Sequence, residues 1–232
     1  MKRVKKLAIG IFLLGQALSG AASAASVTLI GDSVDFTFDD TLMDLFGQPE
    51  VSGNTLFFTP VDFVSQSLNG AGYALTNDTI NIEVTAHSGW SFATVDLLEE
   101  GDYMLLGTGN TANVSGQIRV RDIAMPTVSL TDSIKTDSLL NVTSFSTVDW
   151  LANATVDVSA WDTANTLNVT IENLLVTSSS TPASLAFLEK KFVGLTIDTS
   201  FTAPVPEAET YSMMLAGLGL MGIMVARRRQ RV

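Results

Sequence analysis

The chain has 232 residues, of which 46% are hydrophobic and 16% charged, so it is too apolar for a disordered protein and long enough for one sizeable core. All 24 acidic residues lie between Asp32 and Glu209 among only five cations, and this formal charge of −19 disfavours nucleic-acid binding. The absence of cysteine excludes disulfides, zinc–thiolate sites, iron–sulfur clusters and cysteine nucleophiles, and the single histidine, His87, leaves little for serine–histidine catalysis.

The first 24 residues have the pattern of a secretory signal peptide. Three lysines and an arginine precede an apolar run that begins at Leu7, and small residues follow it, with Ala22 and Ala24 in the A-x-A arrangement of a cleavage site. The run is short for a membrane span, which favours a cleaved signal over an uncleaved membrane helix. We therefore predict that residues 1–24 are a signal peptide, with the Sec translocon and signal peptidase as partners.

Six segments in the middle of the chain alternate apolar and polar residues and are rich in β-branched side chains. They lie at residues 26–38, 77–85, 114–120, 153–159, 166–176 and 192–201. This period-two pattern predicts strands that are half-buried in a sheet. Turn signals separate the segments, among them 69–70, 88–89, 100–102 and 107–110.

Strands with turns at short intervals predict one all-β domain over residues 25–203, an antiparallel β-sandwich or jelly roll. Helical signals in this region are weak. The stretch at 182–191 has proline near its start and could form two helical turns, and 40–46 could form a shorter helix.

Acidic residues crowd near the start of this domain. Asp32, Asp35, Asp39, Asp40 and Asp44 fall within 13 residues, and calcium prefers oxygen ligands of this kind. The cluster lacks the spacing of a calcium-binding loop, so a solvated strand face with its loop is the simpler interpretation. We predict no cofactor and no metal centre, with weak Ca²⁺ or other ligand binding at these aspartates as the alternative.

Three tryptophans, Trp90, Trp150 and Trp161, raise the alternative of a carbohydrate-binding surface, although aromatic rings more often fill a core. Trp90 follows a turn signal at a strand entry, which makes it the candidate for stacking on a ligand. An extracellular hydrolase is a further alternative, since two carboxylates across a cleft can cleave a glycoside. The sequence places no such pair, and we predict that the protein is not an enzyme.

Residues 204–232 form a separate segment with three parts in order. Val205, Pro206 and Glu207 come first with Thr210 shortly after, then an uncharged apolar run over 211–226 that includes Gly217 and Gly219, then Arg227, Arg228 and Arg229. The apolar run is marginal for a membrane span, but flanking side chains can extend it, and arginines stay on the cytoplasmic side. We predict a transmembrane helix over 211–226 that is thin enough to pack closely against a partner membrane protein.

The order of these parts resembles the PEP-CTERM sorting signal of Gram-negative bacteria, with Ala208 where the family has its second proline. The stretch at 95–122 also resembles a recurring pattern of proteins that carry this signal. The resemblance implies recognition by an exosortase, a transpeptidase-like membrane enzyme, and cleavage near Pro206 and Glu207. A plain membrane anchor is the alternative.

These features predict an exported protein of the cell envelope or extracellular matrix. It would occupy the inner membrane in transit, with its C-terminus cytoplasmic, and then reach the cell surface or the extracellular space. The resemblance favours a structural or adhesive, non-catalytic role with extracellular polysaccharide as a partner. The alternatives are a displayed carbohydrate- or calcium-binding module and an extracellular hydrolase.

Overall fold

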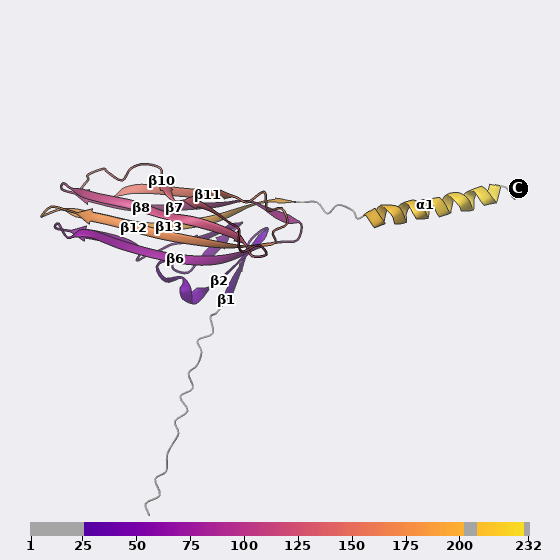
Figure 1. The fold of residues 1–232 in the computed structure, drawn as a ribbon, viewed down its shortest axis with the longest axis horizontal. Coiled ribbons are helices and arrows are strands. Elements are labelled where there is room, and N and C mark those ends of the chain that lie inside the picture. The colour runs from indigo at the N-terminus through magenta and orange to yellow at the C-terminus, as the bar shows by residue number, and fades with distance from the viewer. Residues whose placement is uncertain (1–25, 202–207, 230–232) are drawn as a thin grey trace, which may run out of the picture.

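The computed structural model describes residues 26–201 and 208–229 of the chain. Residues 26–201 form two antiparallel sheets packed face to face, and a helix, α1 (Ala208–Arg229), lies apart from them (Figure 1). The predicted signal peptide at 1–24 and the motif residues Val205, Pro206 and Glu207 lie outside the described residues.

The first sheet has six strands. Their spatial order is β1 (Ser26–Ile30), β2 (Val34–Asp39), β6 (Gly72–Ala86), β12 (Thr166–Ser179), β8 (Asn110–Asp122) and β9 (Ser129–Ser133). Adjacent strands in this order pair antiparallel. β12 is the centre of the sheet, because it pairs over its whole length with β6 on one side and over most of it with β8 on the other.

The second sheet has seven strands. Its order is β10 (Lys135–Thr136), β11 (Val148–Asp157), β7 (Trp90–Leu106), β13 (Leu185–Phe201), β4 (Thr55–Phe58) and β3 (Glu50–Ser52), with β5 (Val64–Leu68) paired to the first part of β13. Its strand pairs are also antiparallel. The predicted all-β fold with antiparallel sheets is therefore confirmed.

The sandwich is elongated because its central strands are long. β7 and β13 have 17 residues each, and at about 3.3 Å per residue such a strand extends roughly 50 Å. One end of the sandwich holds the start of β13 at Leu185, and the other holds its end at Phe201, from which the chain continues toward α1 (Figure 1). Leu185 and Phe201 therefore mark opposite ends of the sandwich.

Alternating apolar residues of both sheets fill a single core. On β11 the buried positions are Trp150, Ala152, Ala154 and Val156, each separated by one outward-facing residue. The same alternation runs along β12 and β13 and joins one continuous apolar cluster. Burying a large aliphatic or aromatic side chain contributes about 1.5–3 kcal/mol, so this pattern stabilises the pairing of the sheets.

Toward the Leu185 end, the interior between the sheets becomes polar. The hydroxyl groups of Ser65 and Thr177 lie 2.9 Å apart, and those of Ser67 and Ser179 also lie 2.9 Å apart. All four side chains are buried. Each pair joins a strand of one sheet to a strand of the other, so hydrogen bonds replace apolar packing at this end.

The six predicted strand segments are strands over most of their length, but two other predictions are wrong. The stretch at 182–191, whose weak helical signal allowed two helical turns, contributes the first part of β13, and the predicted turn at 100–102 lies inside β7. The stretch at 40–46 forms two short 3-10 helices, η1 (Asp40–Leu42) and η2 (Asp44–Phe46). Gly101 is typical of a turn, and the charged residues at the end of 182–191 are typical of a helix end. In the structure, however, Gly101 and Lys190 are paired residues of the neighbouring strands β7 and β13.

Gly101 is needed for close packing, and this gives a first prediction. A Cβ added to it would lie 2.6 Å from the Trp150 ring and would also meet the carbonyl oxygen of Glu189. Gly101→Ala should therefore lower the free energy of unfolding by about 1–3 kcal/mol, as overpacking does. Urea unfolding followed by tryptophan fluorescence measures it, and Gly217→Ala, where nothing lies near the added Cβ, should leave the transition of the sandwich unchanged.

In the part of the chain that the structure describes, α1 included, no helix has the combination of length and apolar character that a membrane span requires. The predicted transmembrane helix over 211–226 therefore has no support from the structure.

Candidate functional site

The aspartates singled out in the sequence do not form a shared site, and two of them have separate side-chain partners. Asp35 lies 2.8 Å from Nε2 of His87, and Asp39 accepts hydrogen bonds from the backbone N–H and the hydroxyl of Thr41. The backbone N–H of Asp32 donates to Gly53. Asp40, in η1, has a buried Oδ1 that accepts no hydrogen bond from the described residues. Within those residues no three acidic or histidine side chains group as a metal site would need, and calcium binding stays a prediction.

The tryptophans divide between core and surface. Trp150 is buried between the sheets and Trp161 packs against the edge of the core. Trp90, at the start of β7, is half-buried, and its ring centroid lies 5.4 Å from that of Phe201 in an edge-to-face contact. This aromatic pair stands at the Phe201 end, where the chain leaves the sandwich toward the sorting segment.

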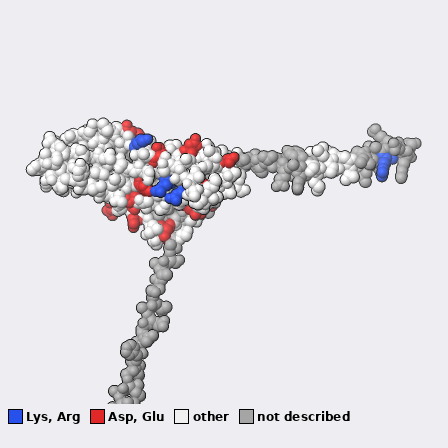
Figure 2. Space-filling view, in the orientation of Figure 1, with Lys and Arg blue, Asp and Glu red and all other residues white. Residues whose placement is uncertain are grey.

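The opposite end of the sandwich, which we call the tip, consists of the strand ends near Gly72, Leu106, Asn110, Ser179 and Leu185. In Figure 2 this end shows no charged side chain, while acidic residues gather over the half nearer α1. The sequence agrees, because residues 103–118 and 173–188 contain no Asp, Glu, Lys or Arg. A protein with so many acidic residues thus presents an electrically neutral end.

The tip contains a pocket of about 440 Å³. Its walls are the β7–β8 turn over 107–111 and the segment 139–143, and every lining residue is uncharged. Gly107 and Gly109 adopt φ of 83° and 73°, a left-handed backbone that glycine allows. The hydroxyls of Ser180 and Thr181 donate to the carbonyl oxygens of Gly109 and Thr108, which fixes this turn against the β12–β13 turn.

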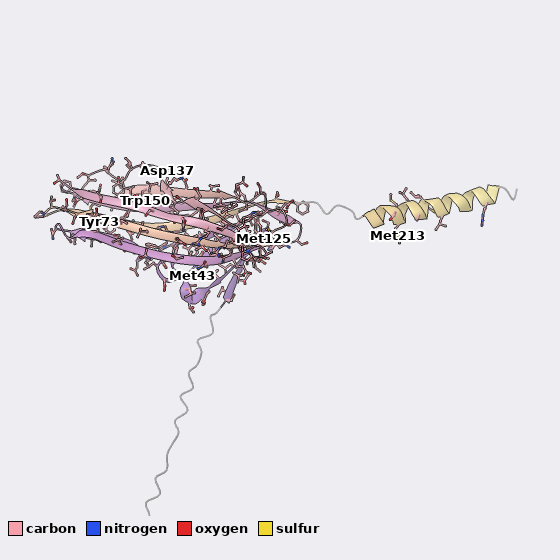
Figure 3. All side chains as sticks on the ribbon, viewed as in Figure 1. Met43, Tyr73, Met125, Asp137, Trp150 and Met213 are labelled. Carbon is pink, nitrogen blue, oxygen red and sulfur yellow. The ribbon has the colours of Figure 1, made fainter. Side chains whose placement is uncertain are left out.

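One large apolar side chain of the tip pocket faces solvent, and others face solvent on β6 and just after the segment 139–143. Leu139, which lines the pocket, is 80% exposed, and Phe145 is 96% exposed. Tyr73 and Leu75 are 77% and 62% exposed on β6, and Figure 3 places Tyr73 toward the end of the sandwich far from α1. An exposed apolar side chain at a pocket, such as Leu139, is typical of surfaces that bind a partner.

Among the described residues, the carboxyl groups of Asp132 and Asp157 have pKa values displaced toward the ionised form. The backbone N–H of Thr155 lowers the pKa of Asp132, and the hydroxyl and N–H of Ser159 lower that of Asp157. A glycosidase needs instead a carboxylic acid whose pKa is raised. Neither aspartate lines the pocket of about 400 Å³ that holds Glu100, Asp149 and Lys191.

A buried polar cluster lies where β7, β12 and β13 meet, and sequence reasoning missed it. It contains Glu99 and Lys190, both 0% exposed, and Asn173, 3% exposed. Burial lowers the pKa of Lys190, and the charge of Glu99 opposes that shift. The alternation of Ala186, Leu188 and Lys190 was the signal that could have placed this lysine on the inner face of a strand.

Comparison with solved structures finds only a distant likeness. Structures of infectious bursal disease virus, Gx and Gt strains, share 12% and 10% identity with the chain at TM-scores of 0.29 and 0.25. The matches cover 76% and 73% of this chain and 49% and 47% of theirs, so the chain spans about half the length of those structures. At such TM-scores the likeness carries no argument.

A comparison with curated proteins finds no match. The family model described as the PEP-CTERM protein-sorting motif matches residues 204–230, the segment that the sequence pattern singled out. This motif marks exported proteins that pass through a membrane and are sorted by an exosortase. The chain is therefore a protein with a PEP-CTERM sorting motif in residues 204–230, targeted to an exosortase-type sorting enzyme.

Proposed function

We propose that this chain is a structural or adhesive protein of the cell envelope or extracellular matrix, without catalysis of its own. It would enter through the Sec translocon, lose its signal peptide, and be processed by an exosortase near Pro206 and Glu207. Its final place would be the cell surface or the extracellular polymer. One observation carries the proposal: the sorting motif and the neutral, pocketed tip stand at opposite ends of the same elongated sandwich.

The distance between the Phe201 end and the tip suits a protein that is held at one end and presents the other end outward. The chain passes from Phe201 into the sorting segment, while the tip lies at the other end of a strand that extends roughly 50 Å. A protein held through its sorting segment would therefore present the tip outward. The acidic residues near the held end would keep the body soluble through mutual repulsion.

The chemistry of the tip favours a neutral polymer rich in hydroxyl groups. Asn110, Thr111, Asn141 and Thr143 line the pocket and supply amide and hydroxyl groups, and Leu139 supplies an apolar contact. Sugars present both hydroxyl groups and apolar ring faces, and aromatic side chains such as Tyr73 can stack on those faces. Extracellular polysaccharide without charged substituents is the partner that these groups fit best.

The test replaces an exposed apolar residue of the tip with a charge. Leu139→Asp should weaken binding to neutral extracellular polysaccharide about tenfold, the loss of roughly 1.4 kcal/mol that removing a central contact commonly costs. The matched control is Leu42→Asp, which alters a side chain that is 60% exposed on η1, away from the tip.

Affinity electrophoresis in gels that contain the polysaccharide measures both variants. Equal retention of Leu139→Asp, Leu42→Asp and the unaltered protein would contradict binding at the tip. Repeating the measurement with added calcium and with a chelator tests the alternative of a calcium-dependent module. Such a module would lose its retention when calcium is removed. Release of reducing sugar ends during the assay would instead support the hydrolase alternative.

A further inference from the structure

Three inward-facing polar residues of three different strands meet in the core between the two sheets. Lys190 lies on β13, Glu99 on the adjacent β7, and Asn173 on β12 of the facing sheet. Lys190 sits beside a bulge, at which the register of β13 against β7 shifts between Lys190 and Phe192. Fully buried charges are costly, so a lysine and a glutamate at 0% exposure need a reason.

The lysine amine is held against both partners. Nζ of Lys190 donates a hydrogen bond to Oδ1 of Asn173 and lies 2.5 Å from Oε2 of Glu99. Phe63 fixes the lysine from both ends, since its carbonyl oxygen accepts from the backbone N–H of Lys190 and its ring centroid lies 5.2 Å from Nζ. The amide carbon Cγ of Asn173 is one bond beyond the oxygen that Nζ contacts.

The cluster is poorly satisfied as a set of separate side chains. Neither oxygen of Glu99 accepts a hydrogen bond of ordinary geometry, and Nδ2 of Asn173 has no partner among the described residues. A buried polar group without a partner is destabilising. Burial also lowers the pKa of Lys190, which favours the neutral amine, the form with a lone pair that can attack a carbonyl carbon.

We propose that Lys190 and Asn173 form an intramolecular isopeptide bond, with Glu99 as the proton carrier. The amine nitrogen of Lys190 attacks Cγ of Asn173 while Glu99 takes a proton from the amine and shares it with Oδ1. The new C–N bond forms as the bond from Cγ to Nδ2 breaks, and Nδ2 leaves as ammonia with the proton that Glu99 returns. An amine and a primary amide become a secondary amide and ammonia, so no oxidant, reductant or other reactant is needed.

The surroundings suit this reaction. Holding both reactants side by side in the buried core replaces a bimolecular encounter by a fixed approach, which raises the reaction rate by large factors. The product removes the buried ionisable amine of Lys190 and the amide nitrogen of Asn173, which has no partner among the described residues. It also ties β12 of one sheet to β13 of the other, a covalent connection between sheets in a chain that has no cysteine for a disulfide.

The test is mass spectrometry of the folded full chain after denaturation and digestion with trypsin. A linked chain should give fragment 136–191 lighter than its calculated mass by one ammonia, because trypsin cannot cut after an acylated Lys190. Cutting the backbone between the two residues, after Phe187 for example, should leave two pieces joined through Asn173 and Lys190. A fragment at its full calculated mass would overturn the proposal and leave an ordinary buried ion pair.

Variants separate the three roles. Lys190→Arg should show no loss of ammonia, whereas the matched control Lys191→Arg, one residue along the same strand, should lose it as the unaltered chain does. Glu99→Gln keeps both reacting groups and should slow bond formation about 100-fold or more, as removal of a general acid–base does. Bond formation at the original rate in Glu99→Gln would overturn the role of Glu99. The mass of fragment 136–191 from the unaltered chain tests the bond itself, and this measurement does not depend on the folding of any variant.

Discussion

Lys190→Met should lower the free energy of unfolding by about 3–5 kcal/mol, because it leaves the carboxyl group of Glu99 buried without its polar partner. Glu99 and Lys190 are both fully buried, with Nζ and Oε2 2.5 Å apart, so water cannot replace the lost partner. For a domain of this size such a loss lowers the thermal midpoint by roughly 10 °C. Differential scanning calorimetry of the full chain measures it.

Two further variants identify the cause of the loss. Lys135→Met removes a lysine that is 72% exposed and 3.7 Å from Asp132, and it should cost less than about 1 kcal/mol. The double variant Lys190→Met with Glu99→Leu removes both buried polar groups and should recover part of the loss, but not the part due to the missing covalent link. A midpoint for Lys190→Met equal to that for Lys135→Met would contradict this description of the core.

Replacing Pro206 and Glu207 together with alanine should reduce processing of the chain in its native host about tenfold or more. Both residues lie in the segment that the sorting-motif model matches. If the sorting enzyme contacts them as the bond is cut, losing contacts worth about 1.4 kcal/mol slows the step tenfold. Immunoblotting of membrane and culture-medium fractions measures the ratio of unprocessed to processed chain.

The matched control for this variant is Ala203→Ser, which changes a residue just outside the matched segment. It should be processed at the original rate, because it leaves the motif intact. Normal processing of the Pro206 and Glu207 double variant would show that the sorting enzyme does not depend on these two residues.

Much of the fold could be predicted because its strands follow a local rule. The alternation at 153–159 and 166–176 puts every second side chain on one face, and those side chains are in the core. The sorting segment could also be predicted from the sequence, because the motif, the apolar run and the arginines follow one another within a short stretch. The family model matches this stretch.

The buried cluster could not be predicted because its members are distant in the sequence. Glu99 directly precedes the turn signal at 100–102, and Lys190 lies in the stretch at 182–191, which carries a weak helical signal. Only the pairing of β7 with β13 and the packing of β12 on them bring the two residues to Asn173. The tip pocket was missed for the same reason, because it joins the turn at 107–111 to the segment at 139–143.

Mass spectrometry of the protein recovered from the surface or medium of its native host tests the central claim of exosortase sorting most directly. Sorting predicts a final residue close to Pro206 and Glu207 and no peptide from 217–229, together with a first residue at or just after 25. Recovery of the chain from the cytosol with Arg227, Arg228 and Arg229 still attached would contradict it.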